Sequence, residues 1–442
     1  MKLMRWSRSL AFVVVIGLVY AGAVFATGQP EAADAPRTLS VWSTLTQESR
    51  ANALQEIADA FADQHPMVSD VDITVMPWGG AFDRMVSAIL ARTVPDVATV
   101  GQGWAQSLAG TGGIMELSDV IERVGGEDIF LGTSLIPQGS VGGVPYSLPL
   151  YVTPHILTYR QSWLDEVGMS PPETWEELYE VSVAVTDPAE NRYGWAMPFA
   201  DIHGGKPAWA FLLSNGVTIF EPVAEDEWEL NIDQPNAVEA YDFMYRLARD
   251  AAPPGVTSYT TGDIRELIAD SVVMTRLDTP EMLLEVRQTN PDILDDFGLT
   301  PFPSRERRGS SQGWVAFVGF NEGQQELAKD FMEFVFSEDR LIPYYLSYPY
   351  AMFPAVASHW EHPDYVEGIS NEYPELEPLL DFGPEVLDHS SGISMWEGDN
   401  PWAGEIENRA LLSEAVQLML VQGYTAEQAV EWLEGQLRGM MD

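Results

Sequence analysis

The sequence predicts an α/β fold that is divided between more than one lobe. Its 442 residues exceed what one ordinary hydrophobic core covers, which favours two or three domains. Within residues 37–100, strand-like and helix-like patterns alternate in the order β-α-β-α-β. This order is typical of a parallel sheet covered by helices. The hydrophobic content of 46% indicates a globular chain rather than a disordered one.

Periodicity places the individual elements of this first unit. An alternating segment at 38–42 predicts a strand, and apolar residues spaced i, i+3, i+4 and i+7 over 54–61 predict a helix. A second strand is predicted at 71–75, a second amphipathic helix at 82–90 and a short apolar strand at 95–100.

Each of the three strands leads into a tryptophan beside small or amide residues. Trp42 and Thr44 come at the end of the first strand, Trp78 follows the second, and Gln102 and Trp104 follow the third. Ligands of open α/β sheets bind beyond the carboxyl ends of the strands. One such tryptophan would more simply be core, but three at the same position in the sheet favour a binding surface.

The rest of the chain continues the mixed pattern and ends with helices. Three prolines within 142–160 predict an extended segment that crosses between lobes. Thr174 with Glu177, and Thr425 with Gln428, are capping boxes that predict helix starts. Further helices are predicted at 206–216 and 236–250, and a helix that runs into a strand at 262–274. The last hundred residues are predicted to be mostly helical.

The N-terminus has the pattern of a secretory signal peptide. Three basic residues precede an apolar run at 10–24, and a small-residue cleavage site follows at Ala26. The run is shorter than the roughly 20 residues of a spanning helix, which favours cleavage over an uncleaved anchor. Residues 27–36 have linker composition. The chain has no cysteine, which excludes a lipoprotein anchor, disulfides and thiolate metal sites.

The formal net charge of −44 limits the classes of partner. Nucleic-acid binding needs a basic surface, as does binding to anionic lipid, so neither is expected. Only three lysines occur, and arginine carries most of the positive charge. Such a surface suits saline surroundings, where salt screens the repulsion between like charges, although a merely soluble acidic protein is the simpler alternative.

No catalytic or cofactor motif is present. HExxH, GxSxG and GxxxxGK[ST] are absent, and GQGWAQ (101–106) lacks the third glycine of a dinucleotide fingerprint. His359 and His362 form a near pair, but Pro363 follows directly and disfavours a helical metal site. The chain instead has 14 tryptophans and 16 tyrosines, many beside glycine, serine or proline. Aromatic faces stack on the C–H faces of sugars, so the composition favours recognition over catalysis, without cofactor or metal.

Several motifs in order resemble the family 1 extracellular solute-binding proteins of ABC importers, the group that contains the maltose-binding protein. The resemblance runs from about Thr38 to Arg438, and its motifs are LSVW, FADQHP, VPDVATV, GGIMEL, GVPYSLPLYVTPHILTYRQSWLDEVGMSPPETWEEL, SNGVTIF, LIADSVVM with TRLDTPE, ELAKDFMEFVFSED and VQGYTAEQAVEWL. The PPETWEEL element is the most specific of them.

The resemblance implies a type II periplasmic binding protein fold with two lobes. Each lobe would be a sheet flanked by helices, with a hinge of two or three crossovers and a helical C-terminal region. Lobe 1 would comprise 37–150 and 272–320, and lobe 2 would comprise 151–271 and 321–442. The ligand would lie between the lobes, which would close on it by hinge motion.

The resemblance also implies ligand-binding residues on both lobes. Aromatic side chains would stack on the ligand, and Gln102, Arg276 and Asp278 would bond its hydroxyl groups. The candidates on lobe 1 are Trp42, Thr44, Trp78, Gln102, Trp104, Tyr151, Arg276, Asp278 and Trp314, and those on lobe 2 are Trp209, Tyr350, Trp396 and Trp402. Core packing or a solvated surface is the alternative for each of them.

The implied function is that of the periplasmic solute-binding component of an ABC importer. It would bind a sugar or oligosaccharide and deliver it to the membrane permease, as a monomer and not as an enzyme. One alternative keeps the fold but binds a cationic solute such as a polyamine, with Asp201, Asp278 or Asp399 pairing with its ammonium groups. A less favoured alternative is an exported carbohydrate-active enzyme, for which no catalytic motif is found.

Overall fold

The computed structural model describes residues 35–101, 103–132, 135–224, 227–232, 234–305, 309–396 and 400–441. The predicted signal peptide and most of the predicted linker lie outside the described residues, as do Gln102 and Asp399. Among the helices in the described ranges, none is both long and apolar enough to cross a membrane.

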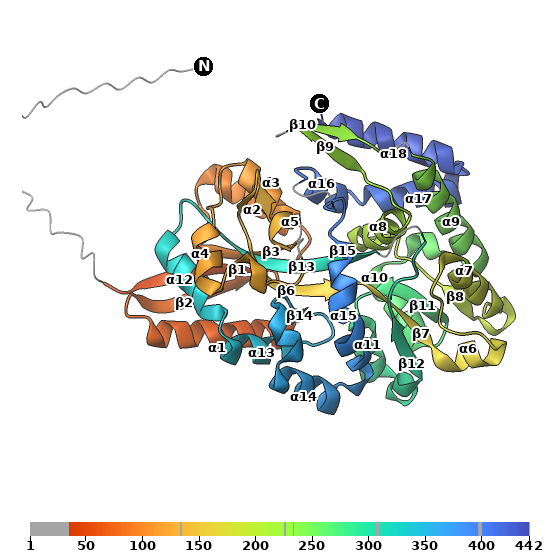
Figure 1. Ribbon diagram of the computed structural model, residues 1–442, viewed down its shortest axis with the longest axis horizontal. Coiled ribbons are helices and arrows are strands. Elements are labelled where there is room, and N and C mark those ends of the chain that lie inside the picture. Colours follow the sequence, from red (N-terminus) through yellow and green to blue (C-terminus); the bar gives the residue numbers. More distant parts are fainter. Residues whose placement is uncertain are drawn as a thin grey trace, which may run out of the picture.

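A seven-stranded sheet forms the core of the first lobe, toward the left of Figure 1. Its strands in spatial order are β14 (Phe353–Pro354), β6 (Leu148–Pro154), β13 (Ser310–Gly319), β3 (Val97–Gly101), β1 (Arg37–Ser43) and β2 (Val68–Val75), with β15 (Ser390–Ser391) paired to β13. Strand β1 pairs in parallel with β2 and β3, as the β-α-β-α-β pattern predicted. The carboxyl ends of these three strands therefore meet at one edge of the sheet.

A four-stranded sheet forms the core of the second lobe, toward the right of Figure 1. Its strands in spatial order are β12 (Phe297–Thr300), β7 (Ile156–Arg160), β11 (Val273–Asp278) and β8 (Tyr193–Trp195). Strand β11 runs antiparallel to β7 and parallel to β8. Only His155 separates β6 from β7, so the extended segment crosses between the sheets as predicted.

Helices cover both sheets (Figure 1). The first lobe has α1 (Glu48–Gln64), α2 (Ala81–Ala91), α3 (Trp104–Gly110), α4 (Ser118–Val124), α5 (Leu135–Gln138), α12 (Gln325–Val335), α13 (Glu338–Leu346), α14 (Pro363–Glu372) and α15 (Pro378–Asp388), with the hairpin β4 (Ser140–Val141) and β5 (Val144–Pro145). The second lobe has α6 (Gln161–Val167), α7 (Trp175–Ala184), α8 (Gly205–Ser214), α9 (Pro235–Ala251), α10 (Thr261–Ala269), α11 (Glu281–Thr289), α16 (Ala403–Asn408), α17 (Leu411–Gln422) and α18 (Ala426–Met441), with the hairpin β9 (Phe220–Ala224) and β10 (Glu227–Leu230).

The two predicted capping boxes are present. The hydroxyl of Thr174 accepts from the amide of Glu177, whose carboxylate accepts from the amide of Thr174 at the start of α7. The same exchange joins Thr425 to Gln428 before α18. A capping box satisfies two of the backbone N–H groups that a helix leaves unpaired at its start, which is why these boundaries could be predicted.

The sheet topology differs from the predicted lobe boundaries. Strands β11 and β12 were expected in lobe 1 but lie in the four-stranded sheet. Strands β14 and β15 were expected in lobe 2 but pair with β6 and β13 of the seven-stranded sheet. Helices α12 and α13 likewise pack on α1 of the first lobe. A buried apolar strand such as β11 suits either sheet, because its hydrophobic pattern does not encode which distant strand it will join.

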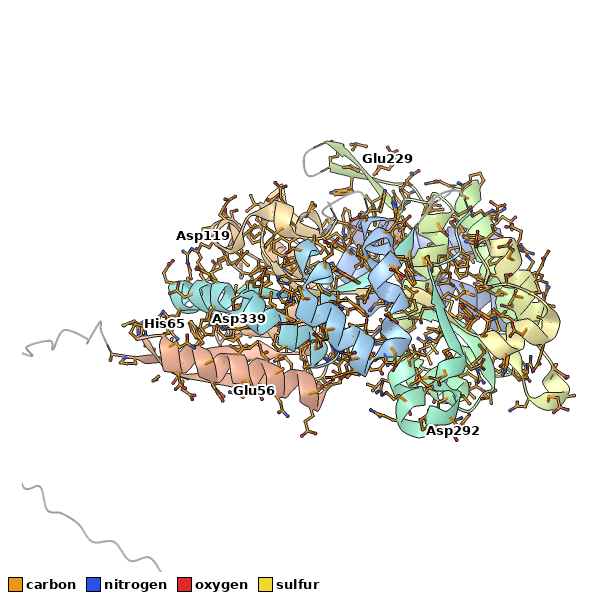
Figure 2. All side chains as sticks on the ribbon, turned by 60° about the horizontal axis from the view of Figure 1, so that its bottom comes forward. Glu56, His65, Asp119, Glu229, Asp292 and Asp339 are labelled. Atoms are coloured by element: carbon orange, nitrogen blue, oxygen red, sulfur yellow. The ribbon has the colours of Figure 1, made fainter. Side chains whose placement is uncertain are left out.

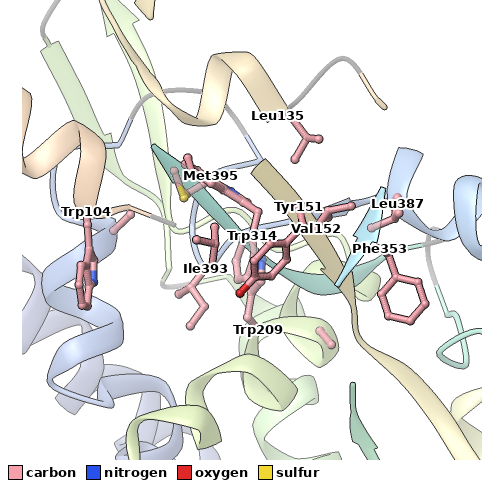
Figure 3. Close-up of a cluster of buried hydrophobic side chains, with 14 of the residues drawn as sticks. Trp104, Leu135, Tyr151, Val152, Trp209, Trp314, Phe353, Leu387, Ile393 and Met395 are labelled. Carbon is pink, nitrogen blue, oxygen red and sulfur yellow. The ribbon is translucent and has the colours of Figure 1, made fainter. Parts of the chain in front are cut away.

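Buried hydrophobic side chains form one large cluster that extends through both lobes, with a smaller cluster around Trp163 in the second. Figure 3 shows part of the large cluster, with Tyr151 and Trp314 near its centre. Acidic side chains lie on the outside: Figure 2 labels Glu56, Asp119 and Asp292 among those exposed on different elements. The strong negative charge therefore faces solvent, where hydration and counter-ions lower its cost.

Candidate ligand-binding site

A cavity of about 450 Å³ lies between the two lobes. From the first lobe it is lined at the junctions that follow β1, β2 and β3, and by β6 and β13. From the second lobe it is lined by the first turns of α8, α10 and α11, by the end of β11, and by α16. The carboxyl ends of the parallel strands thus face the cavity, as expected for an α/β sheet.

Six of the predicted site residues line this cavity. They are Trp78, Trp104, Tyr151, Arg276, Asp278 and Trp314. The rings of Trp78 and Trp104 meet edge to face with centroids 5.4 Å apart, and together they form an aromatic corner beside Gly101. A Cβ atom at Gly101 would lie 3.1 Å from the Trp78 ring, so a larger residue there would displace the indole. The indole N–H of Trp314 donates to Oε1 of Gln138 at 3.3 Å, which fixes its ring.

Six other predicted residues do not line the cavity: Trp42, Thr44, Trp209, Tyr350, Trp396 and Trp402. Thr44 is fully buried, and its amide and hydroxyl both bond to the hydroxyl of Thr99. Trp209 is also fully buried and donates to Oγ of Ser391 at 3.2 Å. The expectation that these two residues face an interlobe ligand is therefore corrected, because neither has an accessible surface to offer.

The other four residues have partners outside the cavity. Trp42 lies within β1, and the guanidinium of Arg84 covers its ring at 4.6 Å from the centroid. The Trp402 ring stacks on Phe220 with a centroid separation of 4.8 Å. Tyr350 is buried, and its hydroxyl forms hydrogen bonds with Glu375 and Arg287. Trp396 is partly buried and packs against the large hydrophobic cluster.

Asp278 is the centre of a buried charge network in the second lobe. Its carboxylate lies 3.0 Å from Nη2 of Arg276 and 3.0 Å from Nη2 of Arg265. Burial raises the pKa of Asp278, but the two guanidinium groups outweigh this and hold the pKa well below its ordinary value. Arg276 is 1% exposed and also donates to the carbonyl of Thr261 at 3.0 Å.

Glu281 connects this network to the first lobe. Its carboxylate lies 2.8 Å from Nη2 of Arg265 in the second lobe. It also accepts from the hydroxyl of Tyr348 at 2.6 Å and lies 3.9 Å from Nη2 of Arg50, both in the first lobe. Arg50 in turn donates to the hydroxyl of Tyr151 at 3.0 Å. One wall of the cavity is therefore a continuous polar link between the lobes.

Lys206, His155 and His203 form a second group of polar side chains at the cavity. Lys206 lies in the first turn of α8, 3.8 Å from Oε1 of Glu407. Burial and the charge of Lys206 lower the pKa of His155 to about 3 and that of His203 to about 4. Both imidazoles are therefore neutral at physiological pH, and Nδ1 of His155 lies 2.6 Å from Oγ of Ser311.

Sequence reasoning missed most of the charged lining residues. Arg50, Lys206 and Glu281 lie in the first turn of their helices and Arg265 lies in the second turn of α10, at positions that look like ordinary solvent-exposed charges in sequence. Their place in the sequence could have identified them, because each lies near the beginning of a helix that follows a strand or a capping residue. That edge of the sheet is where ligands of α/β proteins bind.

Lowering the pH from 6.5 to 4 is expected to reduce the free energy of unfolding. The two histidines bind protons in the unfolded chain below about pH 6.5 but stay neutral in the fold until about pH 3 for His155 and 4 for His203. The two neutral histidines therefore cost no stability above about pH 6.5. As the pH falls below that value, each lowers the free energy of unfolding by at most about 1.4 kcal/mol per pH unit. Urea unfolding at a series of pH values measures this slope.

The variant His155→Gln removes one of the two titrating groups. It should therefore reduce the slope of the free energy of unfolding against pH by the contribution of one proton. His389→Gln, which changes an exposed histidine, serves as the matched control. If both variants kept the slope of the unchanged protein, His155 would not be the group that titrates.

Comparisons with known proteins agree with this architecture. The melibiose/raffinose/stachyose-binding protein MelE of Bacillus subtilis is 21% identical over 340 residues, which cover 73% of this chain and 76% of MelE. The diacetylchitobiose-binding protein DasA of Streptomyces coelicolor is 26% identical over 146 residues, a third of each chain.

Solved structures share the fold. An ABC transporter solute-binding protein of Thermotoga lettingae, solved with α-D-tagatose, superposes with a TM-score of 0.75 at 20% identity, covering 92% of this chain and 100% of the other. Maltose-bound MalE3 of T. maritima gives a TM-score of 0.74 at 21% identity, covering 91% and 99%. These likenesses confirm the expected two-lobed type II periplasmic binding protein fold.

The model of one family matches residues 46–340, about two thirds of the chain. The matched region contains the four-stranded sheet and strands β2, β3, β6 and β13 of the seven-stranded sheet. It also contains every lining residue of the cavity except Ala351, Glu407 and Asn408. The chain belongs to the bacterial extracellular solute-binding proteins.

Proposed function

We propose that this protein is the solute-binding component of an ABC importer and that it captures a sugar or oligosaccharide in the interlobe cavity. The observation that carries the proposal is the lining itself. Three tryptophans and a tyrosine stand beside fixed polar groups, in a cavity to which both lobes contribute. Aromatic rings offer apolar faces to sugar C–H groups, and a few placed polar groups fix the orientation of a ligand.

The biological role follows from the family and the predicted leader. The predicted signal peptide would export the chain to the periplasm, where it would act as a monomer. Ligand would favour the form in which the lobes are in contact, and the membrane permease would recognise that form. Sugar-binding relatives such as MelE and DasA support a carbohydrate ligand.

The arrangement of the carboxylates argues against a polyamine. Asp278 is paired with Arg265 and Arg276, and Asp201 accepts from the amides of Thr261 and His203. A cationic ligand would have to displace two arginines or a helix cap to reach either carboxylate. Neither aspartate is therefore available to an ammonium group.

Addition of a cognate sugar is expected to raise the melting temperature and shift the tryptophan emission. A ligand that binds only the folded state must stabilise it, and Trp78, Trp104 and Trp314 line the cavity. A thermal-shift and fluorescence screen over mono- and oligosaccharides, with spermidine and putrescine as comparison compounds, measures both effects. A response to the polyamines with none to any sugar would contradict the proposal.

A further inference from the structure

Cations are concentrated at the cavity of this acidic protein. Among the residues that the structure describes, four lysines or arginines and four aspartates or glutamates line it, although the chain has 23 of the former and 67 of the latter. The four cations are Arg50, Lys206, Arg265 and Arg276. The cavity is therefore much less negative than the rest of the molecule. An anionic group would be repelled less in the cavity than elsewhere on the protein.

Three of these four cations are already held by protein groups. Arg265 and Arg276 both pair with Asp278 at 3.0 Å, and Arg50 donates to Tyr151 and faces Glu281. Such guanidinium groups are fixed and charge-compensated, so they shape the wall of the cavity rather than offer a free charge to a ligand.

Lys206 is different. Among the described residues its ammonium group makes no hydrogen bond, and its one carboxylate neighbour, Glu407, is 3.8 Å away. Burial raises the pKa of Glu407, which weakens this neighbour as a counter-ion. An ammonium group has three N–H donors, and leaving them unused in a half-enclosed cavity is unfavourable.

The surroundings of Lys206 leave room for a partner. A Cβ atom at Gly313 would lie 3.7 Å from Nζ of Lys206, in van der Waals contact with it, so the absence of a side chain at Gly313 leaves that volume beside the ammonium group unfilled. The neighbouring imidazoles of His155 and His203 are neutral and cannot supply a negative charge. Lys206 also lies in the first turn of α8, where the helix dipole favours an anion.

We propose that the cavity takes an acidic carbohydrate, such as a uronic acid or a short oligosaccharide that contains one, and that Lys206 binds its carboxylate. The inference rests on the proposed function and narrows its ligand class. A carboxylate is favoured over a phosphate because the single positive charge of Lys206 matches a single negative charge, whereas a phosphate monoester carries nearly two.

The test is calorimetric titration with matched pairs of sugars that differ in the acid group. D-Galacturonate and D-glucuronate are compared with D-galactose and D-glucose, and galactose 6-phosphate tests the phosphate alternative. At least one acid should bind more tightly than its neutral partner. Lys206→Gln should weaken binding of that acid by at least about tenfold, the worth of one charge-assisted hydrogen bond, and change the affinity for the neutral sugar less than threefold.

Two further variants separate the charge effect from general damage. Lys329→Gln changes the other described lysine, which pairs with Asp119 on the surface at 2.8 Å, and should leave all affinities unchanged. Glu407→Gln removes the neighbouring carboxylate and should strengthen binding of the acid. If Lys206 only neutralised Glu407, this variant would bring no gain.

Three results would overturn the inference. They are equal affinity for acid and neutral sugars, an equal loss for both classes in Lys206→Gln, or tighter binding of the phosphate than of any uronate. In these cases a neutral or phosphorylated sugar still binds, so the proposed function stands. If no acidic sugar of the panel bound, the inference would fail, and if no sugar of the wider screen bound, the proposed function would fail with it.

Discussion

Replacing Asp278 by asparagine is expected to lower the free energy of unfolding by about 3–5 kcal/mol, the usual cost of removing one partner from a buried ion pair. The substitution keeps the size of the side chain but removes its charge. Arg265 retains Glu281 at 2.8 Å, whereas Arg276, which is 1% exposed, loses its carboxylate partner. An uncompensated guanidinium in the interior is the source of the loss. Urea unfolding at pH 7 measures it.

The matched control is Asp242→Asn. Asp242 pairs with Arg246 across one turn of α9, and both side chains are substantially exposed. Solvent screens such a pair, so the expected loss is at most about 1 kcal/mol. Equal losses in the two variants would contradict the assigned role of the buried network.

The difference between the unchanged protein and Asp278→Asn should also depend on pH. Because the fold lowers the pKa of Asp278, its stabilisation is present above the pKa of an unfolded aspartate, near 3.9, and is lost as the pH falls below it. The two proteins should therefore converge in stability in strong acid. A constant difference down to pH 2 would assign the effect to packing instead of charge.

Local rules predicted much of this fold because they act over a few residues. The parallel arrangement of β1, β2 and β3 followed from the alternation of strand and helix patterns, and the capping boxes marked the starts of α7 and α18. The lobe boundaries could not be obtained in this way. Strand β11 joins β7, which lies more than a hundred residues earlier, and no local pattern encodes that choice.

The same distinction applies to the site. Trp78 and Trp104 were predicted because they follow parallel strands, whose carboxyl ends must share one edge of the sheet. Thr44 follows β1 at the corresponding place, yet its side chain turns to Thr99 in the interior. The contact between Glu281 and Arg50 joins residues more than two hundred positions apart, so only the three-dimensional structure reveals it.

Gly103→Ala is expected to weaken ligand binding by at least about tenfold with a modest loss of stability. Gly103 directly precedes α3 in the first lobe, and Gly404 lies in the first turn of α16 in the second. A Cβ atom at Gly103 would lie 2.8 Å from the amide nitrogen of Gly404, which is too close for a real contact. The lobes touch here backbone to backbone beside the cavity, so the added methyl group should hold them apart.

A small destabilisation of the form in which the lobes are in contact is enough for a tenfold loss of affinity, because a factor of ten corresponds to about 1.4 kcal/mol. The affinity of a sugar identified in the screen is measured by calorimetry. Small-angle scattering with and without that sugar measures whether the lobes still come together.

Gly143→Ala separates the steric effect from backbone strain. Both glycines have a φ of +74°, which disfavours alanine, but a Cβ atom at Gly143 would meet nothing within 4 Å. In both variants the alanine is held in the left-handed conformation, which should lower the free energy of unfolding by about 1–2 kcal/mol. Any further loss at Gly103 would come from the clash with Gly404. Only Gly103→Ala should lose affinity. If both variants bound the sugar as tightly as the unchanged protein, the contact between α3 and α16 would not be part of the ligand-bound form.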